Sequence, residues 1–124
     1  MFPSYEEMGE VLDSLAEELP QVFFEGLNLG VVLFEDLKVH HQAVNEDLII
    51  LGEYHRTKLG RQIRIYYRSF RRVYGHLEYE ELVEELRETL RHEFTHHIQD
   101  LAGDKSLEIE DGLKLAKWEE RRKK

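Results

Sequence analysis

A helical period runs without interruption through residues 80–101, and it constrains the fold more than any other feature of the chain. Apolar residues recur there at intervals of three and four, which is the spacing of one face of an α-helix. The stripe consists of Val83, Leu86, Leu90, Phe94, Ile98 and Leu101. We therefore expect one long helix that buries this face against a core.

The same segment carries an HExxH motif at residues 92–96. Residues i and i+4 lie on one face of a helix, so the imidazoles of His92 and His96 are expected to bind one zinc ion. Both project roughly opposite the apolar stripe, toward a cleft. Glu93 is expected to be the general base that takes a proton from a zinc-activated water. His97 falls on the apolar side, where we expect a packed, hydrogen-bonded core residue.

A third zinc ligand is needed, because a catalytic zinc ion normally has three protein ligands and a water molecule. The metzincin continuation of the motif would place it at Ala102, which has no donor atom, so this subclass is excluded. Asp104 lies about 12 Å along the helix axis from His96, and Asp100 lies about 12 Å from His92, so both are too far away to complete the site. We therefore expect the ligand from chain that turns back beyond the helix, where Glu108 and Asp111 are both suitable.

Length and composition limit the domain organisation and the compartment. A chain of 124 residues with 41% hydrophobic content is expected to form one domain, residues 1–124. The sequence has no cysteine, which favours a reducing cytoplasm. Its first residues lack the features of a signal peptide, and it has no run of eighteen apolar residues. We expect a soluble cytoplasmic protein that does not act at a membrane.

The formal net charge of −9 argues against binding to nucleic acid or anionic lipid. One basic segment, residues 61–72, mixes five arginines with aromatic residues, a composition that a protein binding single-stranded nucleic acid could use. Arginines on the solvent face of a strand are the simpler interpretation, and the surrounding chain is acidic. We therefore expect no nucleic-acid partner.

Upstream of the motif, the pattern predicts one helix followed by short strands. Ser4 and Glu7 form a capping-box pattern, and helical spacing continues to Pro20. Strands are predicted at residues 31–34, 48–51 and 62–66. The fold class is therefore α+β. We expect residues 61–67 to form the edge strand along the cleft, with residues 48–54 as the alternative, and an extended substrate to pair with that edge.

Residues 90–97, 101–103 and 107–111 resemble the small bacterial zincin-like metallopeptidase family of minimal gluzincin-like domains, and residues 51–54 and 63–66 resemble its strand motifs. The resemblance covers most of the chain. It implies a minimal zincin-like fold with an N-terminal helix, a mixed sheet of three to four strands, the HExxH helix and a short C-terminal helix. It also implies a Zn²⁺ cofactor and favours Asp111 over Glu108 as the third ligand.

Two classes of function follow from these patterns. In the first, the protein is a zinc-dependent peptidase, whose partner is a peptide or protein substrate. His92, His96 and Asp111 hold the metal, and Glu93 handles protons. In the second, it is a non-catalytic binding module that keeps the zincin fold with an empty or structural metal site.

Overall fold

The structure, a computed structural model, describes residues 1–41 and 48–103. Two long α-helices, α1 (Tyr5–Glu17) and α3 (Tyr79–Gly103), are joined by a 3-10 helix η1 (Gln21–Phe24), short strands and a short helix α2 (Tyr67–Tyr74). The strands are β1 (Val31–Phe34), β2 (Lys38–Val39), β3 (Ile49–Ile50), β4 (Gly52–Thr57) and β5 (Gly60–Tyr66). The described part is therefore a mixed α+β structure, as predicted.

The main sheet has the order β1-β5-β4, with β5 in the centre. Strand β5 runs parallel to β1, with Val31 opposite Ile63, and antiparallel to β4, with Tyr54 opposite Ile63. Strands β4 and β5 form a hairpin, and β2 pairs with β3 in a separate two-stranded ribbon. The sheet is thus mixed, and β4 is an edge strand within the described residues.

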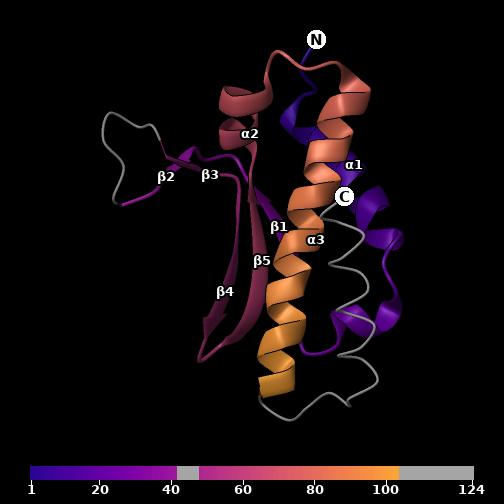
Figure 1. The fold of residues 1–124 in the computed structure, drawn as a ribbon, viewed down its shortest axis with the longest axis vertical. Coiled ribbons are helices and arrows are strands. Elements are labelled where there is room, and N and C mark those ends of the chain that lie inside the picture. The colour runs from indigo at the N-terminus through magenta and orange to yellow at the C-terminus, as the bar shows by residue number, and fades with distance from the viewer. Residues whose placement is uncertain (42–47, 104–124) are drawn as a thin grey trace.

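Helix α3 packs along one face of this sheet, with β4 beside it and α1 on its other side (Figure 1). The core between these layers is made of large apolar side chains: Met8, Leu12, Leu15, Phe23, Ile63, Ile65, Phe70, Leu86, Leu90, Phe94 and Ile98. All five residues of the predicted stripe from Leu86 onward are buried. The helical period therefore predicted both the helix and its core-facing side.

The N-terminal prediction is also confirmed. The Ser4 hydroxyl accepts a hydrogen bond from the Glu7 backbone N–H, and the Glu7 carboxylate accepts one from the Ser4 backbone N–H. This reciprocal pair satisfies two amide groups that a helix start leaves without helical partners. Helix α1 ends at Glu17, shortly before Pro20.

Two predictions about the strands were wrong. The edge strand along α3 is β4, not residues 61–67, because β5 pairs on both sides and lies inside the sheet; β4 overlaps the alternative, residues 48–54, at residues 52–54. The basic segment is not one strand: it changes from β5 to α2 at Tyr66, so Arg68, Arg71 and Arg72 lie on a helix. The predicted strand at residues 48–51 contains β3, and β4 begins only after it, in residues with mostly polar or amphipathic side chains.

Gly52 lies where β4 approaches α3. A Cβ atom at this position would lie 3.1 Å from Cγ2 of Thr89 on α3 and 3.1 Å from the Arg64 carbonyl oxygen. Such contacts are tighter than ordinary packing allows, so the absence of a side chain permits the close approach. Strand β4 can therefore lie close to the helix one turn before His92.

None of the helices within the described ranges 1–41 and 48–103 has a stretch that is long and apolar enough to cross a membrane. The predicted short C-terminal helix lies outside the described residues.

Candidate metal centre

His92 and His96 are neighbours on the exposed face of α3. Their Nε2 atoms are 3.1 Å apart, and their rings meet edge to face with centroids 4.6 Å apart. Zinc–nitrogen bonds of about 2.0–2.1 Å in a tetrahedral arrangement place two ligand nitrogens roughly 3.3 Å from each other. The two imidazoles therefore already have nearly the separation that one zinc ion requires.

Glu93 lies between the two histidines in sequence but is buried, with 5% of its surface exposed. Burial disfavours the charged carboxylate, and the nearby negative charge of Glu53 adds to this effect; together they raise the pKa of Glu93 to about 7. A carboxyl group with a pKa near neutrality exchanges protons readily at physiological pH, which is the property of a general base and acid.

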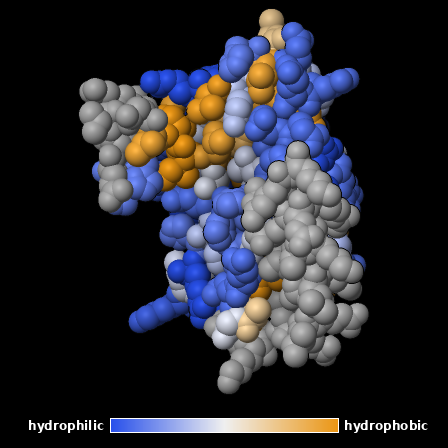
Figure 2. All heavy atoms as spheres, in the orientation of Figure 1, coloured by the Kyte–Doolittle hydropathy of each residue, from blue (hydrophilic) through white to orange (hydrophobic). Residues whose placement is uncertain are grey.

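A cleft of about 700 Å³ opens over these side chains. One wall is α3, with His92, Glu93, His96, Gln99 and Asp100; the other is β3 and β4, with Ile50, Gly52, Glu53, Tyr54 and Arg56. In Figure 2 apolar atoms gather on the surface near β3, whereas the surface over β4 is hydrophilic. The cleft therefore runs along an edge strand from an apolar end to a charged end.

Glu53 is one of three carboxylates that line the cleft, with Glu93 and Asp100, and sequence reasoning missed it. Its Oε1 accepts a hydrogen bond of 2.6 Å from the Tyr66 hydroxyl and lies 3.7 Å from Nζ of Lys38. Burial and the Glu53 carboxylate raise the pKa of Tyr66 to about 12, so the hydroxyl remains a donor. Residues 51–54 resemble a strand motif, but nothing in the sequence indicated that Glu53 lies beside the HExxH helix, because this contact depends on how β4 packs against α3.

Within residues 1–41 and 48–103, no cluster of three or more His, Cys, Asp or Glu side chains has the arrangement to hold a metal ion. The third-ligand candidates Asp111 and Glu108 lie outside the described residues, so their role stays a prediction. Asp100 was expected to lie too far from His92 to join the site. Its carboxylate instead accepts hydrogen bonds from Tyr54, Arg56 and Arg61.

His97 is a buried core residue, as predicted: it is fully covered, and both ring nitrogens have partners. Its Nε2 lies 2.7 Å from the Glu25 carbonyl oxygen and its Nδ1 lies 3.0 Å from the Tyr54 hydroxyl. Burial lowers the pKa of His97 and favours the neutral ring. The adjacent residues His96 and His97 thus lie on different faces of the helix, one exposed and one buried.

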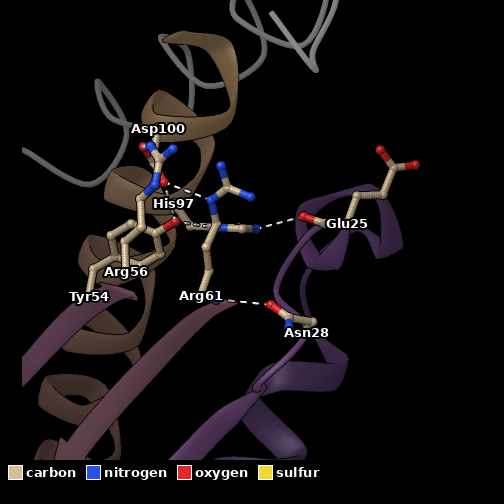
Figure 3. Close-up of polar contacts among 7 residues, drawn as sticks. All are labelled: Glu25, Asn28, Tyr54, Arg56, Arg61, His97 and Asp100. Carbon is tan, nitrogen blue, oxygen red and sulfur yellow. Dashed lines mark hydrogen bonds and ion pairs between the residues drawn. The ribbon is translucent and has the colours of Figure 1, made fainter. Parts of the chain in front are cut away.

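Tyr54 belongs to the β4 wall of the cleft. Its ring lines the cleft, but its hydroxyl is bound to His97 and to Asp100, at 2.7 Å from Oδ2. Burial opposes ionisation of Asp100, yet hydrogen bonds from Arg61, Tyr54 and Arg56 outweigh it and keep the Asp100 pKa below its ordinary value. This network joins the cleft wall to the helix (Figure 3).

Comparison with known proteins places the chain in a family through a solved structure. The chain is 35% identical to a conserved hypothetical protein from Thermus thermophilus, with a TM-score of 0.72, over 82% of this chain and 99% of that chain. The chain belongs to the same family as that protein. No known family profile matches the sequence. No curated protein matches it either.

Proposed function

We propose that the protein is a zinc-dependent metallopeptidase of the zincin-like type. The observation that carries this proposal is the convergence of His92 and His96, with Nε2 atoms 3.1 Å apart, beside the buried carboxyl group of Glu93. The three side chains open into one cleft with the edge strand β4 as its opposite wall. This is the arrangement in which an HExxH helix hydrolyses peptide bonds.

His92 and His96 would hold the zinc ion through Nε2, with Asp111 proposed as the third ligand. When bound, zinc supplies Lewis acidity toward a water molecule and toward the scissile carbonyl group. Glu93 accepts the proton of the attacking water and later returns it to the leaving amine. A pKa of about 7 suits both steps, since neither protonation state is strongly disfavoured near neutral pH.

Strand β4 would hold the substrate. Within the described residues β4 pairs with a strand on one edge, β5, and we propose that an extended peptide pairs with the other edge. Backbone hydrogen bonds of this kind give affinity without requiring a particular sequence. The substrate class we propose is therefore an extended segment of peptide or unfolded protein.

The first experiment measures zinc content in protein purified without chelator. We expect one zinc ion per chain, and loss of that ion in the double variant His92→Ala with His96→Ala. The variant His76→Ala is the matched control, because His76 is exposed and remote from the cleft. An unchanged zinc content in the double variant would overturn the metal site.

The second experiment tests the chemistry with Glu93→Gln, which should keep zinc because Glu93 is not a ligand. Loss of the proton acceptor is expected to slow cleavage of a mixed peptide library by about a hundredfold to ten-thousandfold. Product termini are identified by mass spectrometry, and Glu80→Gln, an exposed change on the same helix, is the control. Equal cleavage by parent and Glu93→Gln would contradict the peptidase. Zinc binding without cleavage by the parent would favour a binding module.

A further inference from the structure

We propose that a network of five side chains centred on Asp100 is a positioning element that fixes strand β4 against the metal-binding face of α3. The Asp100 network comprises Tyr54, Arg56, Arg61, His97 and Asp100 (Figure 3). The role of the network in catalysis rests on the function proposed above. Its effect on amide exchange in β4 can be measured whether or not the protein is a peptidase.

The contacts of Asp100 join the hairpin to the helix at three points. Its Oδ2 accepts hydrogen bonds from the Tyr54 hydroxyl at 2.7 Å and from Nε of Arg61 at 2.8 Å, and its Oδ1 accepts one from Nη1 of Arg56. Two of the donors come from β4 and one from β5. Charge-assisted hydrogen bonds are stronger than neutral ones, and the Asp100 and Arg61 side chains are each only 19% exposed.

His97 extends the network to a third part of the chain. Since a carbonyl oxygen only accepts, Nε2 of His97 must donate to the Glu25 carbonyl, which leaves Nδ1 of the neutral ring as an acceptor. The single phenolic proton of Tyr54 is then shared between Nδ1 of His97 and Oδ2 of Asp100. Tyr54 is therefore the residue through which the cleft wall contacts both helix side chains.

The location of the network relative to the site gives it a positioning role. Asp100 lies one turn beyond His96 on α3, and His97 follows His96 directly in the chain. On the other side of the two histidines, the absence of a side chain at Gly52 lets β4 lie close to Thr89. Strand β4 therefore lies close to α3 before the turn that carries His92 and His96, and the network fixes it after that turn, which sets the width of the cleft.

A second ion pair on α3 provides a matched control. Arg87 donates to both carboxylate oxygens of Glu18, at 2.9 Å and 3.1 Å, and so connects α3 to the end of α1. This pair resembles the Asp100 contacts in chemistry, but it lies on the α1 side of the helix and neither residue lines the cleft. Loss of Arg87 should affect stability without changing the site.

The experiment compares Tyr54→Phe, Asp100→Asn and Arg87→Ala with the parent, each loaded with Co²⁺ as a spectroscopic substitute for zinc. Strand β4 forms the cleft wall opposite His92 and His96. We therefore expect both network variants to shift the visible absorption spectrum of bound Co²⁺ and to weaken its binding. Arg87→Ala should leave the affinity and the spectrum unchanged.

Backbone amide exchange in the metal-free proteins provides the independent measurement. We expect exchange in β4 to be faster in Tyr54→Phe and Asp100→Asn than in Arg87→Ala. Unchanged Co²⁺ affinity and spectrum in both network variants would reduce the network to a structural contact and overturn the proposal.

A parent protein that binds no Co²⁺ would refute the proposed function instead. In that case the exchange data alone decide whether the network positions β4: faster exchange in the network variants supports the proposal, and equal exchange in all three variants overturns it.

Discussion

The two faces of α3 use the same residue type for opposite purposes. His96 is exposed in the cleft beside His92, whereas His97, the next residue, is fully buried and hydrogen-bonded on both sides. A step of about 100° around the helix is enough to move a side chain from solvent to core. The face of the helix on which a histidine lies, and not the residue type, therefore determines whether its side chain is available to a metal.

The core face should dominate the stability of the fold. Phe94 is fully buried and packs against Phe23 and Phe24, with ring centroids 6.5 Å and 4.9 Å away. We expect Phe94→Ala to lower the free energy of unfolding by about 3–5 kcal/mol, because it removes the transfer energy and leaves a cavity. Urea unfolding followed by circular dichroism measures the loss. A loss below that of Phe94→Leu would show that the core face is not the principal support of α3.

Glu93 lies at the boundary between the faces, and its burial should make stability depend on pH. Below pH 4.5 the carboxyl group is protonated in the folded and unfolded chains alike. Between pH 4.5 and about 7 only the unfolded chain releases its proton, so metal-free protein loses stability as the pH rises. The shift corresponds to roughly 3 kcal/mol at about 1.4 kcal/mol per pKa unit.

The variant Glu93→Gln should remove most of this pH dependence. We expect its free energy of unfolding, relative to the parent, to increase by roughly 3 kcal/mol between about pH 4.5 and about pH 8 in the presence of a chelator. Urea unfolding at several pH values gives the difference. The exposed change Glu80→Gln should show none, and a flat difference for Glu93→Gln would mean that its carboxyl group is not buried in solution.

The cleft face should contribute least to stability. In metal-free protein, replacing both His92 and His96 with alanine is expected to change the free energy of unfolding by no more than about 0.5 kcal/mol per site, because both side chains are exposed. The same variant should lose all zinc, so metal binding would be lost while the free energy of unfolding stays nearly unchanged. A loss comparable to that of Phe94→Ala would show that the two faces are not independent.

The sequence by itself determined the features that depend on local periodicity. The positions of Leu86, Leu90, Phe94 and Ile98 predicted α3 and its buried side, and the HExxH spacing alone predicted that His92 and His96 would meet. The Ser4–Glu7 capping box was also readable, because both partners lie within one helical turn. Helical geometry links neighbours three and four residues apart, so such predictions need no knowledge of the rest of the chain.

Only the tertiary structure decided which strand forms the cleft wall and what holds it there. Residues 52–57 alternate weakly, and their edge position follows from the pairing of β5 with both β1 and β4, which no local pattern encodes. Helix geometry was enough to exclude Asp100 as a zinc ligand, but it could not predict the hydrogen-bond partners of Asp100. These partners, Tyr54 and Arg61, lie 46 and 39 residues away in the chain. Contacts over such separations depend on how the layers pack, and the raised pKa of Glu93 depends on the same packing because burial is its main cause.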